Sequence, residues 1–182
     1  MRKKLKSASG LTLVELLCAA VILMLLGLLV NVGIQVAVSS CRDLTAEAES
    51  QLLLSTAAAA LTDELRYARD VSTDASGGVT SYRSASFGPG TCLAVDANGR
   101  IVAESGGQVK QLLPPGAYGI NGAYRAADLE ITAGEDGDKQ LTFTLQLKIE
   151  TADQKTSAKM PSGGMAVRCL NPVKEEEGGT PP

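Results

Sequence analysis

The stretch Gly10-Leu11-Thr12-Leu13-Val14-Glu15, together with the apolar run that follows it, decides the fold of this chain. No charged or strongly polar side chain occurs in residues 16–30, and the apolar character continues to Val38 with interruptions at Asn31, Gly33 and Gln35. A helix of about 20 mostly apolar residues can cross a bilayer, because every backbone polar group is then paired inside the helix. The sequence therefore predicts a membrane-spanning helix over residues 11–38.

Basic residues lie on one side of this run. The ten-residue leader carries four of them, Arg2, Lys3, Lys4 and Lys6, whereas Arg42 is the first basic residue after the run. Such a bias keeps the basic end of a membrane helix in the cytoplasm. We therefore expect a single-pass protein of the cell membrane whose N-terminus is cytoplasmic and whose remaining residues lie outside.

Glu15 is the one charged side chain inside the apolar segment. An unpaired carboxylate in hydrocarbon costs about 3 kcal/mol, so Glu15 needs a cationic partner or access to water. One interpretation is that its side chain reaches back to the headgroups. The other depends on the Gly10–Leu11 bond. If that bond is cut, the new amine of Leu11 lies one helical turn from Glu15, and the Glu15 of one subunit can pair with the amine of the next.

A basic leader that ends in glycine, followed by Leu-Thr-Leu-Val-Glu and an unbroken apolar helix, resembles the class III signal of type IV prepilins and pseudopilins. The resemblance is close over residues 3–38, with Leu11 where the family most often has phenylalanine. It implies that a prepilin peptidase cuts after Gly10, that Leu11 becomes the N-methylated first residue, and that Glu15 neutralises a neighbour's amine in a filament. The partners it implies are other pilin-like subunits, of the same and of different kinds, an assembly ATPase and a membrane platform protein.

Beyond the membrane segment the helix is expected to continue as an amphipathic helix over residues 39–71, because residues 42–71 contain no proline or glycine. Leu54, Ala58, Leu61, Leu65 and Ala68 form one apolar stripe, and Glu64 belongs to the predicted polar face. Residues 72–170 are expected to form a β-rich globular head, and residues 171–182 a disordered polar tail. The predicted fold class is α+β, with a long N-terminal helix packed on a small antiparallel sheet.

Strands are predicted in the head over residues 79–87, 91–95, 100–104, 109–113, 129–133, 139–150 and 165–170. The turn Asp96-Ala97-Asn98-Gly99 indicates a hairpin, because Asn-Gly readily adopts positive φ angles. The segment 139–150 alternates most clearly, with apolar residues at Leu141, Phe143, Leu145, Leu147 and Ile149. Its apolar face is expected to pack on the helical stripe and make the core.

Four cysteines divide by position, since Cys18 lies in the membrane segment and Cys41, Cys92 and Cys169 lie in the exported part. Four cysteines allow three connectivities. A Cys92–Cys169 disulfide would join a strand near the beginning of the head to one near its end, and an exported location permits it. The alternative is that both remain thiols, with Cys41 unpaired or bonded to one of the others.

Composition argues against an enzyme. The chain has no histidine, which excludes Ser-His-Asp and Cys-His mechanisms and His-ligated metals. Its glycine pairs lack the spacing of a phosphate-binding loop, and residues 135–138 lack that of a calcium loop. We expect no catalytic residue, metal or cofactor. The net charge is −3 and becomes −7 without the four basic residues of the leader. DNA remains a candidate partner, but an acidic exported part does not favour binding to it.

The sequence thus predicts a structural subunit of a type IV pilus-like or type II secretion-like filament. One alternative is a minor pseudopilin of a competence DNA-uptake machine. Another is a membrane-anchored or secreted binding module that uses the apolar run only for export, since Ala37-Val38-Ser39 is a passable signal-peptidase site. The length of the apolar run, which exceeds the roughly 7–15 residues usual for a signal peptide, argues against the secreted form.

Overall fold

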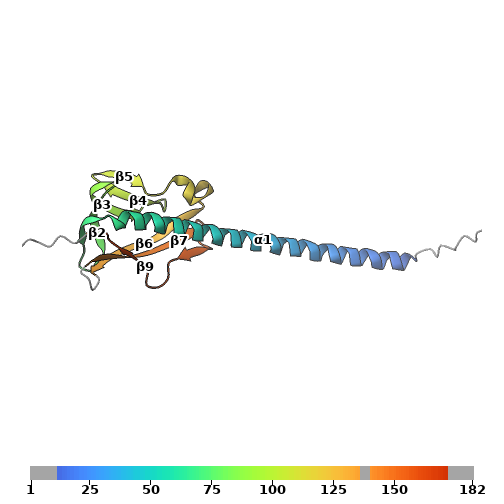
Figure 1. Ribbon diagram of the computed structural model, residues 1–182. Helices are drawn as coiled ribbons and strands as arrows, with labels where there is room; N and C mark the ends of the chain where they lie inside the picture. The colour runs from blue at the N-terminus through green and yellow to red at the C-terminus, as the bar shows by residue number, and fades with distance from the viewer. Residues whose placement is uncertain (1–11, 136–139, 172–182) are drawn as a thin grey trace, which may run out of the picture. The chain divides into compact units, whose positions relative to one another are not determined.

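The computed structural model describes residues 12–135 and 140–171 (Figure 1). The chain divides into two compact units, residues 1–44 and 45–182, which are described separately. The helix α1 (Leu13–Arg66) contributes to both of them. The structure confirms the predicted class, α+β, with one long N-terminal helix and antiparallel sheets.

The described part of the first unit is the N-terminal portion of α1. Thr12 precedes the helix, and every residue from 13 to 44 has an exposed side chain. The helix is continuous through Gly27 and Gly33, which both lie within it. Such continuity is expected where apolar residues with good helix propensity surround isolated glycines.

The second unit contains two antiparallel sheets. The first has five strands in sequence order: β1 (Arg69–Thr73), β2 (Val79–Ser84), β3 (Gly88–Val95), β4 (Ile101–Ser105) and β5 (Gln108–Gln111). The second has β7 (Leu141–Thr151) at its centre, paired with β6 (Tyr124–Glu135) on one side and with β8 (Ser157–Lys159) and β9 (Met165–Arg168) on the other. Two short 3-10 helices, Pro115–Tyr118 and Ile120–Gly122, connect the sheets.

The core of the second unit is one cluster of buried apolar side chains, and it joins the helix to the sheets as predicted. From α1 it takes Leu54, Leu61 and Leu65, and from the alternating face of β7 it takes Phe143, Leu145, Leu147 and Ile149. Tyr82, Tyr118 and Ile101 complete it from the first sheet and the 3-10 turn. The period-two alternation of β7 therefore faces the three-and-four stripe of α1, which lets both elements bury their apolar sides.

The helix ends at Arg66, five residues earlier than predicted. The carbonyls of its last turn are capped from the far end of the chain: Leu170 N–H donates to Arg66 O at 2.8 Å, and Asn171 Nδ2 donates to Tyr67 O at 2.8 Å. Residues from 69 onward instead form β1, which pairs with β2 and leaves Asp70 at a φ of 49°. Tertiary partners thus overrode a helix propensity that local sequence favours.

Two further expectations need correction. Asn171, which was assigned to a disordered tail, is held by the end of α1, and residues 172–182 lie outside the described part of the chain. The short strand β8 was not predicted, because its three residues are too few to show an alternating pattern. Of the predicted turn at residues 135–138, only Glu135 is described, as the last residue of β6.

The hairpin predicted at Asp96-Ala97-Asn98-Gly99 is confirmed. Asp96 N–H and Gly99 N–H close the turn on Arg100 O and Asp96 O, each at 2.9 Å. Gly99 has a φ of 73°, and a Cβ there would overlap Cβ of Arg125 in β6. The glycine therefore serves both the turn and the close approach of the two sheets.

Replacing Gly99 with alanine should lower the free energy of unfolding by about 2 kcal/mol or more, because the new side chain meets a positive φ and an occupied space. Denaturant unfolding of the full chain in detergent would measure it. Gly107→Ala is the matched control, since its φ is 77° but no atom lies within 4 Å of its Cβ position. Equal losses for the two variants would show that the contact with Arg125 contributes nothing.

Candidate functional site

The residues proposed for cleavage and methylation, Gly10 and Leu11, lie outside the described residues, which begin immediately after them at Thr12. Thr12 and Glu15 are described, and they define how the helix begins. The structure therefore shows the local geometry on one side of the predicted cleavage point.

Thr12 caps α1. The N–H of Glu15 donates to Oγ1 of Thr12 at 3.3 Å and to its carbonyl at 3.0 Å, and the N–H of Leu16 donates to that carbonyl at 3.2 Å. Threonine followed three residues later by glutamate is the sequence pattern of a capping box, a signal that our sequence analysis missed. It places Glu15 in the first turn of the helix, where the helix dipole favours a negative charge.

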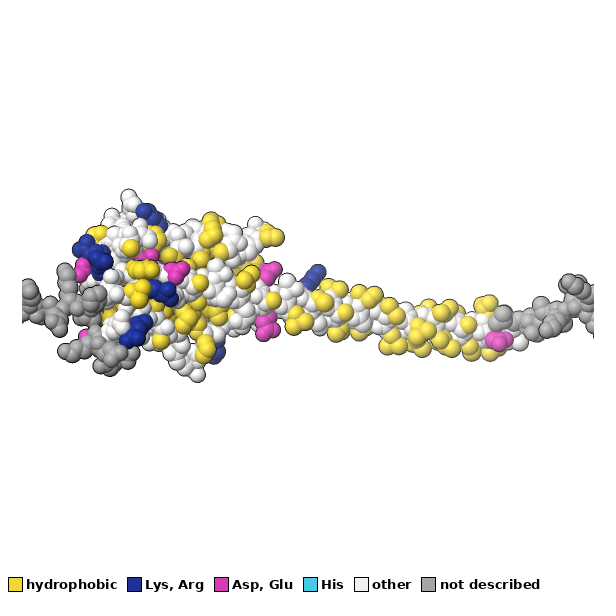
Figure 2. All heavy atoms as spheres, in the orientation of Figure 1, with side chains coloured by type: hydrophobic (Ala, Val, Ile, Leu, Met, Phe, Trp, Pro, Cys, Tyr) yellow, Lys and Arg dark blue, Asp and Glu magenta, His cyan; other side chains and the backbone are white. Residues whose placement is uncertain are grey.

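The helix that follows Glu15 is apolar on all sides. Its large hydrophobic side chains over residues 13–38 are exposed by between 44% at Val38 and 82% at Leu13, so nothing in the described chain covers them. In Figure 2 yellow apolar side chains cover the visible face of this segment. Among the described residues, α1 is the one helix long and apolar enough to cross a membrane. By its length and composition, this helix is compatible with a membrane-spanning segment, or with an export signal, near the N-terminus.

Two amide side chains interrupt this surface. Gln35 Nε2 donates to Asn31 Oδ1 at 3.3 Å, one helical turn apart, and both residues are exposed. No other asparagine or glutamine occurs in residues 13–44. The pair is therefore the first polar feature of α1 after Glu15, and Ser39, Ser40, Arg42 and Asp43 follow it.

Of the two alternatives that the sequence leaves open for Cys92 and Cys169, the structure has the two thiols and not the disulfide. Cys169 is fully buried, and its Sγ donates to Ala68 O at 3.2 Å, whereas Cys92 lies in β3 of the other sheet with its Sγ 3.8 Å from Leu93 O. Burial, with a smaller contribution from Glu104, raises the pKa of the Cys92 thiol. Cys169 therefore contributes to the end of α1 and to the core as a thiol. The other two cysteines, Cys18 and Cys41, are exposed on α1.

Glu64 was predicted to lie on the polar face of the helix but is nearly buried, with 9% of its surface exposed. It accepts a hydrogen bond from the hydroxyl of Tyr82 in β2 at 3.2 Å. Burial and the adjacent Glu64 carboxylate raise the pKa of Tyr82, so its hydroxyl stays protonated and can donate. The pair ties α1 to the first sheet, since the two side chains satisfy each other in the core.

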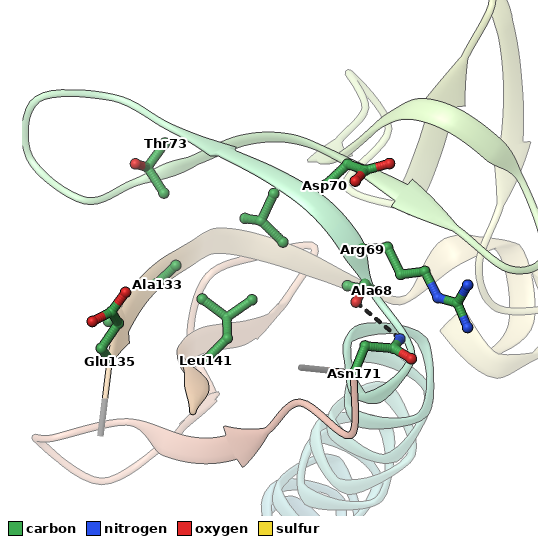
Figure 3. A pocket seen from close by; sticks show the side chains of 10 residues that line it. Ala68, Arg69, Asp70, Thr73, Ala133, Glu135, Leu141 and Asn171 are labelled. Atoms are coloured by element: carbon green, nitrogen blue, oxygen red, sulfur yellow. Dashed lines mark hydrogen bonds between the residues drawn. The ribbon is translucent and has the colours of Figure 1, made fainter. Parts of the chain in front are cut away.

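A cavity of about 650 Å³ opens near the end of α1 (Figure 3). It is bounded by Ala68, strand β1, the adjoining ends of β6 and β7, and Asn171, whose Nδ2 also donates to Ala68 O at 3.1 Å. Arg69, Asp70 and Glu135 bring charges of both signs to its lining. No group of three or more potential metal ligands occurs among the described residues.

The clearest ionic cluster lies on the second sheet. Arg125 of β6 stands opposite Glu150 of β7 and contacts Glu150 Oε1 through Nη2 at 2.7 Å, while Lys148 Nζ lies 3.3 Å from Glu150 Oε2. The hydrogen bond from Arg125, with help from Lys148, lowers the pKa of Glu150. This arrangement serves the register of the strand pair.

Because its pKa is lowered in the folded state, Glu150 stabilises the fold above the unfolded-state pKa of about 4.3, and the effect is lost as pH falls through the folded-state pKa. Glu150→Gln should therefore lower the free energy of unfolding by up to about 1 kcal/mol at pH 7, with the difference shrinking as pH falls below about 4.3 and vanishing below the folded-state pKa. Unfolding curves of both chains across this pH range would test it. Glu130→Gln in β6, at an exposed site, is the control. A Glu150→Gln difference that persists unchanged into acid would contradict the ionic explanation.

Comparison of the sequence and structure with family models, curated proteins and solved structures found no match. The candidate site therefore depends on this chain's own residues, namely the motif over residues 10–15, the capped start of α1 and the exposed apolar helix.

Proposed function

We propose that this chain is a structural subunit, a pilin or minor pseudopilin, of a type IV pilus-like or type II secretion-like filament. It carries out no catalysis. The precursor is anchored in the cell membrane with its N-terminus in the cytoplasm and its second unit outside, and after processing it enters an extracellular filament.

The observation that carries the proposal is the junction of Gly10-Leu11-Thr12-Leu13-Val14-Glu15 with a helical segment, residues 13–38, whose apolar side chains are all exposed. Either feature alone would fit a simple membrane anchor. Their combination places a carboxylate in the first turn of the helix, one turn after the bond expected to be cut. A subunit cut at Gly10 carries a positive amine and a negative carboxylate at the same end of an apolar rod.

Assembly then follows from the chemistry of this rod. In the membrane, lipid tails cover the apolar side chains, and in a filament the helices of neighbouring subunits replace them. Burial of apolar surface contributes roughly 25 cal/mol per Å² relative to water in either environment, so the exchange is nearly balanced. The pair between Glu15 and a neighbour's Leu11 amine would add specificity and axial register. Energy for extraction must come from outside the chain, which is the role of an assembly ATPase and a platform protein.

The deciding experiment is intact and N-terminal mass spectrometry of the protein recovered from its native membrane. We expect a chain that begins at Leu11 and carries one additional methyl group. A start at Ser40 or Cys41 would overturn the proposal in favour of a secreted module, since the apolar run would then be an export signal. An intact Met1 would indicate a simple anchored domain.

A further inference from the structure

The Asn31–Gln35 pair occupies an unusual place on α1. In a chain of straight α-helical geometry, Asn31 lies about 22 Å along the axis from Leu16, at 1.5 Å per residue. That distance places the pair toward the far boundary of a hydrocarbon layer about 30 Å thick. In the membrane, water can reach these amides from the headgroup region. On a face that another apolar helix covers, in the membrane or in a filament, water cannot reach them, and each amide without a partner would cost a few kcal/mol.

The hydrogen bond between the two side chains leaves most of their capacity unused. Gln35 uses one N–H and Asn31 accepts with its Oδ1, so both N–H groups of Asn31 and the Oε1 of Gln35 remain without a partner in this bond. The unused groups are two N–H donors on Asn31, and one N–H donor and the Oε1 acceptor on Gln35. The pair is therefore complementary to a second copy of itself.

The neighbouring positions on the same face permit close approach. At about 100° per residue, Met24, Gly27, Asn31 and Val38 follow the three-and-four spacing of a helix–helix seam. Gly27, one turn before Asn31, has no atom within 4 Å of its Cβ position. Glycine at such a position lets two helix backbones come together in a membrane, and an asparagine in a seam selects one register.

Glu15 lies elsewhere on the helix surface. Sixteen residues separate it from Asn31, which corresponds to about 160° around the axis. The amide face and the Glu15 face therefore serve different neighbours. A subunit that used both would contact one neighbour through its carboxylate and another through its amides.

We propose that Asn31 and Gln35 form a docking site for a second copy of this chain, in which Gln35 Oε1 of one copy accepts a hydrogen bond from Asn31 Nδ2 of the other, with the two helices parallel. This docking site identifies the partner of one face of α1. It rests on the proposed function only for its place in a filament, because the same contact can form between two copies in the membrane.

The test is chemical crosslinking of the full chain in native membranes, in a Cys18→Ala, Cys41→Ser background. A reporter cysteine is placed on the amide face as Met24→Cys, or about 80° from both Asn31 and Glu15 as Leu23→Cys, and is treated with a short membrane-permeant bis-maleimide. We expect several-fold more crosslinked homodimer from Met24→Cys. Asn31→Leu combined with Gln35→Leu should reduce that yield about three- to tenfold, the range expected for interhelical hydrogen bonds. The exchanged pair, Asn31→Gln with Gln35→Asn, should preserve it, because donor and acceptor are retained.

Equal yields from the two reporters, an unchanged yield after the leucine substitutions, or crosslinks to a different protein alone would each overturn the inference. The N-terminus of the same samples is determined in parallel. Amide-dependent crosslinking of a chain that still begins at Met1 would support the docking site and contradict the filament. A chain that begins at Leu11 and enters filaments normally after both leucine substitutions, with unchanged crosslinking, would contradict the docking site alone.

Discussion

Replacing Gly10 with valine should leave the chain at its precursor length. The expected cut follows Gly10, and a peptidase whose pocket is matched to glycine at this position would exclude a branched side chain. We expect cleavage to fall at least a hundredfold, which corresponds to about 2.7 kcal/mol of lost transition-state stabilisation. Mass spectrometry of membrane fractions from cells that contain the prepilin peptidase would show a chain beginning at Met1.

The control for this variant is Ser7→Ala, a leader substitution that leaves both sides of the expected cut unchanged. It should be processed like the natural chain. Insertion into the membrane should be equal in all three chains, because the four basic residues and the apolar run are untouched. Processing of Gly10→Val at the natural rate would remove the main support for a filament subunit.

Glu15→Gln should have the opposite effect. We expect the precursor to be cleaved normally after Gly10, but the mature chain to enter filaments poorly. Glutamine preserves the size of the side chain and its ability to accept a hydrogen bond, but it removes the charge that would pair with the Leu11 amine of a neighbour. The bare amine would then enter an apolar assembly without a counter-charge, at a cost of several kcal/mol. We expect at least a tenfold drop in the ratio of filament-associated to membrane-associated protein, measured by quantitative blotting of sheared filaments.

The same variant separates the competing functions. A secreted or anchored binding module has no use for a charge at Glu15, so Glu15→Gln would leave its export and amount unchanged. Glu47→Gln, at an exposed position further along α1, controls for loss of a helix carboxylate in general. Incorporation of Glu15→Gln at the natural level would show that the Glu15–amine pair is dispensable. Failure of its cleavage would show that Glu15 acts at the earlier, proteolytic step.

The sequence by itself determined the elements whose signal is local. The apolar run of residues 16–30 predicted a membrane-spanning helix. In the structure these residues are helical, and no other described part of the chain covers them. Alternation from Leu141 to Ile149 identified β7 and its buried face, and Asn98-Gly99 marked the hairpin between β3 and β4. Each of these patterns lies within fifteen residues and reflects side-chain composition, backbone periodicity or the conformational freedom of one turn, so no knowledge of distant neighbours was needed.

The tertiary structure alone decided the features that depend on distant partners. The end of α1 at Arg66 is set by capping groups from Cys169, Leu170 and Asn171, about a hundred residues away in the chain. Glu64 is nearly buried because Tyr82 supplies a donor, and Cys169 lies against Ala68 O instead of bonding to Cys92. Helix propensity and cysteine spacing carry no information about such partners. Only packing decides which carbonyl, carboxylate or thiol meets which donor, and in a buried core these pairings outweigh local preference.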